Sequence, residues 1–372
     1  MSTATSSSPS EEPVRLVHVG LGDWGTNWER HAIPPVPEVD RVALVDPHEP
    51  TLRAAQETFG VPDAACFTSL DAALGAVRAD AVLLTTPMTT HVPFALEALA
   101  AGAHVLVEKP FAGTVAEARE AVEVAERAGL TLQVSQNYRS YPAPQEARRL
   151  LRAGAVGELS AVAVDFRRWD HDAPAGASRH YDFPHPLLFD MAIHHVDLLR
   201  MVTGRDAVEV YAKVMDPPWS RYREEASAAL TVEMTGGLVV SYRGSWVSRA
   251  PQTAWAGRWS LEGSDGHLAF TSRGGEGPDD DELELTTATG PGAGTPRRVE
   301  LARPALWGRS AGLRAFAAAV RGGPAPETTG RDNLGSVALM EAAARSAASG
   351  RVEAVERVGR VQGVQRVQEG QA

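Results

Sequence analysis

The sequence predicts an α/β protein built from a doubly wound parallel sheet and a second α/β domain with a mostly antiparallel sheet. Three observations predict it. From residue 14 to residue 134, short β-branched runs alternate with helical patterns, which is typical of a parallel sheet with helices on both faces. A glycine-rich turn follows the first run. After residue 137, longer runs of alternating polar and apolar residues indicate an antiparallel sheet with one covered face.

In the first half of the chain, the β-branched runs define the expected strands and the periodic segments between them define the helices. Thr114 followed by Glu117 is typical of a capping box, in which polar side chains satisfy the first backbone N–H groups of a helix. We expect strands at 14–19, 39–45, 81–84, 104–107 and 130–134, and helices at 51–59, 93–101 and 114–128.

In the second half, a helical run is inserted between the first two expected strands. Gly204 ends that run, Gly236-Gly237 indicates a hairpin turn, and Asp332 is the expected N-cap of the last helix. We expect helices at 145–152, 187–202, 310–320 and 332–348, strands at 159–168, 208–214, 226–233, 238–245, 258–262 and 267–271, and a short hairpin near 283–285.

These elements divide the chain into two domains with a tail at each end. The first residues are mostly Ser, Thr and Glu, and the last are mostly Gln, Arg and Gly, compositions that do not support a packed core. We expect a disordered leader at 1–13, the doubly wound domain at 14–137, the C-terminal α/β domain at 138–356 and a disordered tail at 357–372.

Composition and charge exclude several classes of partner. The net charge of −11 comes without a basic patch, which disfavours nucleic acid and anionic membranes. No apolar run reaches the roughly 18 residues of a membrane helix, and the N-terminus does not resemble a signal or transit peptide. The single cysteine, Cys66, excludes an internal disulfide and fits a reducing cytoplasm. We therefore expect a cytoplasmic protein with a small-molecule partner.

The turn after the first strand has the GxGxxG pattern and opens a helix. In that context Gly20 permits a tight turn, Gly22 lets a pyrophosphate approach the backbone, and Gly25 lets the helix pack closely on the strand. The free N–H groups of the helix N-terminus attract the phosphates. The predicted cofactor-binding residues of this turn are Gly20, Leu21, Gly22, Asp23, Trp24 and Gly25.

An acidic residue at the end of the second strand indicates which dinucleotide binds. Asp46 lies about 20 residues beyond the glycine turn, where a carboxylate hydrogen-bonds the ribose hydroxyls of NAD and repels the ribose phosphate of NADP. NADP stays possible, because His48 or Arg53 could accommodate that phosphate. We therefore expect NAD, with NADP as the alternative.

The segment after the strand at 81–84 lies at the carboxyl edge of the sheet, where open α/β folds bind ligands. It is expected to line the nicotinamide side of the cofactor. Thr89 or Thr90 could also cap the following helix. The predicted cofactor-binding residues here are Thr85, Thr86, Pro87 and His91.

Lys109 is one of only two lysines among 36 basic side chains, the other being Lys213. It ends an apolar strand in the sequence Glu108-Lys109-Pro110. An ammonium fits a tight site as a compact donor, and its pKa responds to burial and neighbours, unlike that of arginine. Lys109 is therefore a candidate catalytic or substrate-contacting residue; the alternative is chance survival in a genome that favours arginine.

A second candidate group lies in the helical run at 187–202. Asp190, His194 and Asp197 are four and three residues apart, on one stripe of an α-helix, so that a carboxylate can orient the imidazole. An oriented histidine is a common general base for an alcohol. His195 points about 100° away and is expected to pack. Two alternatives are a solvated polar face and a metal site built from His180, His185, His194 and nearby acidic residues.

Together these motifs resemble the Gfo/Idh/MocA oxidoreductases. The glycine turn, Glu108-Lys109-Pro110 and the helix with Asp190 and His194 occur in the order typical of that family, and the resemblance covers about 14–353. It implies an N-terminal Rossmann domain and a C-terminal domain whose large open, mostly antiparallel sheet binds substrate and forms homodimers or homotetramers. Gln136 to Arg139 resembles the domain junction of the family.

The resemblance also implies roles for individual residues. His194 takes the hydroxyl proton, Asp190 orients it, and Lys109 hydrogen-bonds the reacting oxygen, although in some relatives the lysine is the base. Ala192, where many relatives have glycine, and the doubled histidine depart from the family pattern. Further residues expected at the cofactor are Glu108, Lys109 and Asn137, and those expected at the substrate are Tyr138, Arg139, Arg167, Trp169, Asp190 and His194.

The predicted function is an NAD-dependent dehydrogenase that oxidises a secondary hydroxyl of a cyclic polyol, sugar or sugar derivative, or reduces the matching ketone. A nicotinamide accepts hydride on one face while the protein removes the proton, so no metal is expected. One alternative is an NAD-dependent glycosidase with no net redox change. Another is a non-catalytic NAD-binding regulator, which would not need the lysine, aspartate and histidine together.

Overall fold

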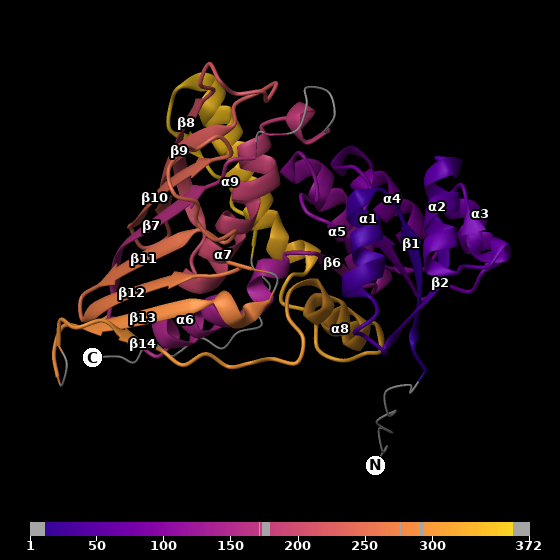
Figure 1. Cartoon of the computed structure of the whole chain (residues 1–372), viewed down its shortest axis with the longest axis horizontal. Coiled ribbons are helices and arrows are strands. Elements are labelled where there is room, and N and C mark those ends of the chain that lie inside the picture. The colour runs from indigo at the N-terminus through magenta and orange to yellow at the C-terminus, as the bar shows by residue number, and fades with distance from the viewer. Residues whose placement is uncertain (1–11, 171, 173–178, 276, 291–292, 360–372) are drawn as a thin grey trace, which may run out of the picture.

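The computed structural model describes residues 12–170, 172, 179–275, 277–290 and 293–359. The predicted leader and tail lie almost wholly outside these ranges. Within them, no helix is long and apolar enough to cross a membrane. The elements form two sheets side by side, with helices between and around them (Figure 1).

The first sheet is parallel and has the strand order β3-β2-β1-β4-β5-β6. The doubly wound architecture expected for the first half is thereby confirmed. The central strand β4 is fully buried, as expected for a strand covered on both faces. The strands are β1 Val14–Val19, β2 Val39–Val45, β3 Cys66–Phe67, β4 Ala81–Leu84, β5 His104–Val107 and β6 Leu132–Val134.

The helices of this half agree with the predicted ones at their C-terminal ends more than at their starts. The helix predicted at 93–101 begins at Met88, so Pro93 lies inside it, and neither Thr89 nor Thr90 is its N-cap, which is Pro87. Two elements were missed, β3 and α3, because each is too short to show a period. The helices are α1 Asp23–Asn27, α2 Glu49–Phe59, α3 Leu70–Ala76, α4 Met88–Ala100 and α5 Val115–Ala128, with π-helix η1 Trp28–Ala32 and 3-10 helix η2 Asp63–Ala65.

The second sheet has nine strands in the order β14-β13-β12-β11-β7-β10-β9-β8-β15. All its pairs are antiparallel except β7 with β10, so the predicted mostly antiparallel sheet is confirmed. Gly236 and Gly237 have positive φ and make the β9–β10 hairpin turn. The strands are β7 Leu159–Arg167, β8 Ala207–Met215, β9 Ser227–Met234, β10 Leu238–Ser245, β11 Arg258–Gly263, β12 Gly266–Thr271, β13 Glu282–Thr287, β14 Arg297–Arg298 and β15 Glu353–Ala354.

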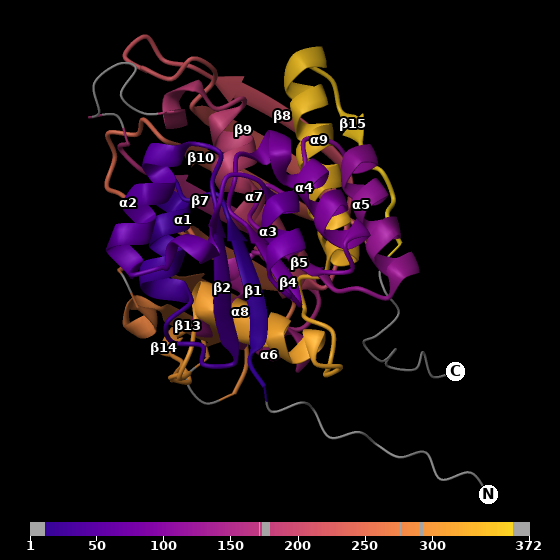
Figure 2. The same ribbon diagram turned by 90° about the vertical axis from the view of Figure 1, so that its right-hand side faces the viewer.

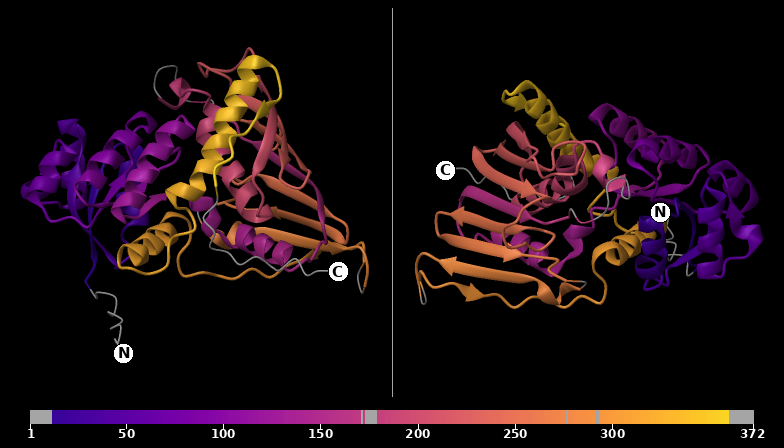
Figure 3. Two further views of the ribbon diagram at one scale, coloured as in Figure 1. Left: turned by 180° about the vertical axis from the view of Figure 1, so that it is seen from behind. Right: turned by 45° about the horizontal axis from the view of Figure 1, so that its top comes forward.

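Helices α6, α7 and α9 cover the face of this sheet that is turned toward the first half of the molecule (Figures 1 and 3). The last helix is capped by Thr329, whose hydroxyl accepts from the N–H of Asp332, so Asp332 is not the N-cap that the sequence predicts. The helices are α6 Pro142–Arg152, α7 Ile193–Thr203, α8 Gly308–Val320 and α9 Gly330–Ser349, with 3-10 helices η3 Asn137–Ser140, η4 Arg179–Asp182 and η6 Pro278–Asp280.

The helical run predicted at 187–202 is two helices of different pitch. Residues Pro186–Ala192 form a π-helix, η5, and only Ile193–Thr203 form the α-helix α7, which Gly204 ends in the left-handed conformation as predicted. A π-helix turns less per residue than an α-helix, so the run does not keep one helical period along its length. This change of pitch lies between Asp190 and His194.

One face of the first sheet is covered by a helix from the far end of the chain. Helices α3, α4 and α5 pack on the face that includes Val17 and Val82. The opposite face, with Leu16 and Leu106, packs on Trp28 of η1 and on Leu313, Phe316 and Ala317 of α8 (Figure 2). The C-terminal part of the chain therefore returns to complete the first domain, and the boundary at 137 stays a prediction of the sequence.

A buried ion-pair network joins η3, α7 and α9. Arg139 binds both oxygens of Asp197, at 2.5 and 2.6 Å, and also donates to Asp332 at 2.7 Å. Arg139 and Asp197 are 6% and 1% exposed. The prediction that Arg139 contacts substrate is therefore wrong, since its guanidinium is occupied inside the protein. Asp197, for the same reason, does not orient His194.

We expect Arg139→Met to lower the free energy of unfolding by about 3–5 kcal/mol, because it leaves the buried Asp197 carboxylate without its partner. The matched control is Arg127→Met, which breaks an exposed i,i+4 pair with Glu123 and should cost less than about 1 kcal/mol. Urea unfolding followed by circular dichroism measures both. Equal losses in the two variants would contradict the role assigned to the buried network.

Candidate active site

The glycine turn has the geometry that its three glycines predict. Gly20 has φ +93°, a left-handed conformation. A Cβ on Gly25 would lie 1.9 Å from the carbonyl oxygen of Gly20, so only glycine lets α1 approach β1 this closely. A Cβ on Gly22, in contrast, would meet nothing within 4 Å. The backbone at Gly22 is thus open on the side where a pyrophosphate would approach.

Asp46 is held directly beside this turn. Its Oδ2 accepts from the N–H of Leu21 at 2.8 Å, and its Oδ1 accepts from the N–H of His48 at 2.9 Å. The side chain is fixed by these bonds, and each carboxylate oxygen keeps a lone pair for a further donor. The position fits a carboxylate that receives the ribose hydroxyls of a dinucleotide.

A layer of buried polar side chains supports the turn from below. His18 on β1 lies between Glu29, at 2.8 Å from its Nδ1, and the hydroxyl of Thr85, at 2.9 Å from its Nε2. Thr85 also donates to the carbonyl of Gly20. The hydroxyl of Thr85 therefore positions the glycine turn from within the protein.

His91 has a structural role that differs from the predicted one. Its ring nitrogens lie 2.8 Å from the carbonyl oxygens of Pro110 and Thr86, and the residue is 1% exposed. Its imidazole thus offers no free atom to a cofactor, and the prediction that His91 binds it is wrong. His91 instead ties the loop after β4 to the loop after β5, and burial lowers its pKa.

Glu108 and Lys109 follow β5, and their side chains point in different directions. The Glu108 carboxylate accepts from the indole Nε1 of Trp28 at 2.8 Å and from the N–H of Lys109 at 3.1 Å, so it faces the protein interior. The ammonium of Lys109 crosses to η5, where it donates to both the backbone carbonyl and the Oδ1 of Asp190 at 2.7 Å. Burial disfavours the charged ammonium, but the Asp190 carboxylate outweighs burial and raises the pKa of Lys109. Lys109 is therefore a charged donor.

His194 lies in the first turn of α7 with its ring stacked on Tyr138. The two ring centroids are 3.9 Å apart and the planes differ by 1°. Burial, followed by the positive charges of Lys109 and Arg273, lowers the pKa of His194 well below its ordinary value. The imidazole is therefore neutral at neutral pH and can accept a proton.

The expected hydrogen bond from the His194 imidazole to the Asp190 carboxylate does not form. The Nδ1 of His194 is buried and has no hydrogen-bond partner among the described residues, whereas Asp190 holds Lys109. The Asp190 carboxylate is instead occupied by the ammonium of Lys109, 2.7 Å away. The structure thus brings Lys109, Asp190 and His194 together, as predicted, but Asp190 positions the lysine.

His195 packs as the sequence predicts. Its Nε2 donates to the carbonyl of Trp255 at 3.0 Å, and its Nδ1 lies 3.1 Å from the hydroxyl of Tyr242. Burial lowers the pKa of His195 to about 4. Both nitrogens of His195 have partners inside the protein, so of the two histidines His194 is the one that stacks on Tyr138.

The remaining predicted substrate residues lie in contacts of their own. Arg167 at the end of β7 pairs with Asp165 at 3.3 Å. The ring of Trp169 lies 3.6 Å below the guanidinium of Arg249, and its Nε1 donates to Asp172 at 3.0 Å. Their contact with substrate stays a prediction, as does that of Tyr138.

The structure brings together only part of the set predicted for the metal alternative. Ligand atoms of His185, Glu224 and Glu225 lie within 4.8 Å of one another among the described residues, without His194. The N–H of His185 already donates to Glu224 at 2.7 Å. The expectation that the reaction uses no metal stays a prediction.

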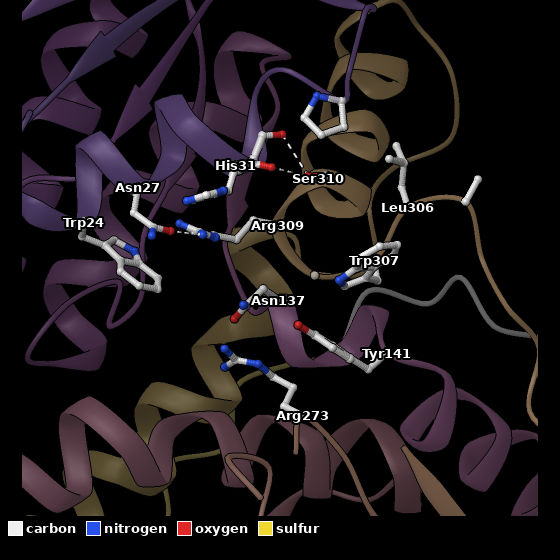
Figure 4. A pocket seen from close by; sticks show the side chains of 14 residues that line it. Trp24, Asn27, His31, Asn137, Tyr141, Arg273, Leu306, Trp307, Arg309 and Ser310 are labelled. Carbon is white, nitrogen blue, oxygen red and sulfur yellow. Dashed lines mark hydrogen bonds between the residues drawn. The ribbon is translucent and has the colours of Figure 1, made fainter. Parts of the chain in front are cut away.

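A cavity of about 440 Å³ opens between the two sheets, next to the glycine turn (Figure 4). Two predicted cofactor residues, Trp24 and Asn137, line it. Most residues of the cavity wall were not predicted from the sequence, because they lie in loops of the second half of the chain. The missed residues include Tyr141, Arg273, Trp307 and Arg309. Only the aromatic and basic residues just before the helix at 310–320 could have indicated it.

Comparison with known proteins assigns this fold and site to a family. Residues 14–136 match the oxidoreductase family with an NAD-binding Rossmann fold, and residues 145–269 match the GFO/IDH/MocA C-terminal domain. D-apiose dehydrogenase of Paraburkholderia graminis is 31% identical over 352 residues, which cover 90% of this chain and 87% of that protein. 1,5-Anhydro-D-fructose reductase of Ensifer adhaerens is 25% identical over 297 residues, covering 78% and 84%.

A solved structure supports the same fold. Aldose-aldose oxidoreductase from Caulobacter crescentus superposes with a TM-score of 0.79 at 22% identity, over 92% of this chain and 100% of that one. The chain belongs to the GFO/IDH/MocA oxidoreductase family, which confirms the resemblance seen in its motifs. It is an NAD-binding oxidoreductase, and the open backbone at Gly22 and the fixed carboxylate of Asp46 fit the cofactor.

We expect Gly22→Ala to lower the affinity for NAD by about tenfold or more, because its methyl group would project into the space that the pyrophosphate needs. The melting temperature should not fall, since that space is open in the protein itself. Gly75→Ala is the matched control: its Cβ also meets nothing within 4 Å, but it lies in α3. Titration calorimetry with NAD compares them, and equal affinities would contradict the assigned phosphate site.

Proposed function

We propose that this protein is an NAD-dependent dehydrogenase that oxidises a secondary hydroxyl of a cyclic polyol, sugar or sugar derivative, or reduces the matching ketone. One observation carries the proposal. Lys109, at the end of β5, is held 2.7 Å from Asp190, and His194 lies four residues further on with its imidazole, whose pKa is lowered by burial, stacked on Tyr138. A proton donor and a proton acceptor at one point are what an alcohol–ketone interconversion requires.

The protein's own residues have separate tasks in this proposal. Bound NAD supplies the hydride acceptor. His194 takes the hydroxyl proton, since its imidazole is neutral at the pH of the cell. Lys109 donates a hydrogen bond to the reacting oxygen and stabilises the negative charge that develops there. Asp190 keeps Lys109 protonated and in place through its 2.7 Å contact.

The names of the relatives support sugars as the substrate class. One relative is a D-apiose dehydrogenase and another a 1,5-anhydro-D-fructose reductase, so both directions of the reaction occur among proteins similar to this chain. Polar and aromatic side chains around the cavity, including His31, Tyr141 and Trp307, suit hydroxyl hydrogen bonds and ring stacking.

The test is NADH absorbance with NAD and a panel of inositols, aldoses, anhydrosugars and amino-sugars. We expect one substrate to produce NADH, and Lys109→Arg and His194→Ala to lower its rate by about 10²–10⁴-fold while NAD still binds. Lys213→Arg, at the other lysine, on the exposed face of β8, is the matched control and should keep the native rate.

An unchanged rate in either site variant would refute the assigned roles. Release of free sugar from a glycoside without accumulation of NADH would identify the glycosidase alternative. NAD binding with no turnover of any kind would identify the regulator.

The same assay, run from pH 5 to pH 10 as initial rates at saturating NAD, separates the two candidate bases. The lowered pKa of His194 means that the neutral base is present at pH 6.5 and above, and is lost only as the pH falls well below 6.5. We therefore expect a flat rate from pH 6.5 to 8. If Lys109, with its raised pKa, were the base, the rate would instead climb about tenfold per pH unit.

We also propose that copies of the chain associate through the outer face of the nine-stranded sheet, as a homodimer or homotetramer, and that the enzyme works in the cytoplasm. Tyr211 and Val239 are 39% and 45% exposed on that face. Sedimentation velocity tests the association. We expect a species at least twice the 39.6 kDa of one chain, and a monomer at micromolar concentration would contradict it.

A further inference from the structure

Two arginines face the cavity between the sheets without a counter-ion. Neither Arg273 nor Arg309 forms an ion pair with a carboxylate in the described part of the chain. The Nε of Arg273 and the Nη1 of Arg309 are buried and have no hydrogen-bond partner there. Buried charges in proteins are normally paired, because an unpaired one loses its hydration without compensation. These two guanidinium groups therefore lack an anion.

The backbone at Arg273 is held in an unfavourable conformation. Its φ of +60° is in the left-handed region, which a side chain as large as arginine rarely adopts. The carboxylate of Asp281 maintains it, accepting from the N–H of Arg273 at 3.0 Å and from the Ser272 hydroxyl at 2.7 Å. Backbone strain of this kind persists where the surrounding structure enforces it, and it is concentrated at functional sites.

The side chain of Arg273 lies near the proposed base, His194, with the ring of Tyr138 between them. Its guanidinium lies 4.4 Å from the centroid of the Tyr138 ring, and Tyr138 stacks on His194. The positive charge of Arg273 is among the causes that lower the pKa of His194, after burial and Lys109. Arg273 lies in the loop that follows β12 of the second sheet, and it lines the cavity together with Trp24 of the glycine turn.

Arg309 approaches the same space from the first turn of α8 (Figure 4). It donates through Nη2 to the side chain of Asn27, and its guanidinium lies 4.4 Å from the Trp24 ring centroid. No side chain caps the N-terminus of α8, so the helix presents its free N–H groups beside the same cavity. Two guanidinium groups and a helix N-terminus make this end of the cavity strongly positive.

We propose that Arg273 and Arg309 form an anion-binding subsite for the substrate, so that the enzyme acts on an acidic sugar, one carrying a carboxylate or a phosphate ester. The inference rests on the proposed dehydrogenase function and adds the substrate class. Arginine is suited to both anions because its planar fork binds two oxygens at once. A neutral sugar of the same shape would leave both charges unpaired, so the subsite selects against it.

The test compares sugars that share a ring and differ in one group. D-glucuronate, D-glucose 6-phosphate and D-glucose, with their galacto counterparts, are titrated into NAD-loaded protein by calorimetry. We expect an acidic member of one set to bind at least about tenfold more tightly than its neutral counterpart. The acid that binds identifies carboxylate or phosphate as the anion.

Variants then assign the effect to the subsite. Arg273→Met and Arg309→Met should each remove most of the preference for the acidic sugar, while circular dichroism and NAD affinity stay native. Arg303→Met, which removes a charge from an 88% exposed side chain near the same segment, is the matched control and should keep the preference.

The outcomes separate this proposal from the proposed function. Equal binding of acidic and neutral sugars, or an acid preference that survives Arg273→Met, would overturn the subsite. Loss of NAD affinity in both arginine variants without any effect on sugars would also overturn it, because the anion would then be the pyrophosphate of the cofactor. An acidic sugar that binds as expected but yields no NADH would support the subsite and contradict the dehydrogenase.

Discussion

The contact between Lys109 and Asp190 is the interaction on which the site depends. It joins the end of β5 in the first sheet to η5, which packs on the second. An ammonium that is largely removed from water needs a carboxylate beside it. Because Asp190 supplies one from the other half of the molecule, the pairing holds the two halves in register and places His194, four residues further on, at the same point.

The surroundings of the site raise the pKa of Lys109 and lower the pKa of His194. Burial disfavours the charged form of both Lys109 and His194. A carboxylate reverses this effect for the lysine, whereas further positive charges add to it for the histidine. Lys109 is therefore a proton donor and His194 a proton acceptor at the same pH. Proton transfer to and from an alcohol needs both. These two protonation states do not depend on a hydrogen bond between Asp190 and His194.

The net charge of the chain and the charge at its cavity have opposite signs. The chain as a whole carries −11, which disfavours anionic macromolecules as partners. The cavity between its sheets is nevertheless positive, because Arg273 and Arg309 lie there without carboxylates. Their position depends on a strained turn at Arg273 and on the return of α8 to the first sheet, neither of which a count of charges can reveal.

Local patterns along the sequence were sufficient for both sheets and for the glycine turn with Asp46, because each of these depends on neighbours in the chain, through strand alternation or turn geometry. The grouping of Lys109, Asp190 and His194 in one site was implied by the resemblance to the family, through the order of its motifs. The partners of Arg139, His91 and Asp190, the π-helical pitch of η5 and the wall with Arg273 and Arg309 were decided by tertiary structure alone. The physical reason is that burial, ion pairing and helix pitch at these positions are set by segments as far as 282 residues away, which become neighbours only when the two sheets and α8 have packed together.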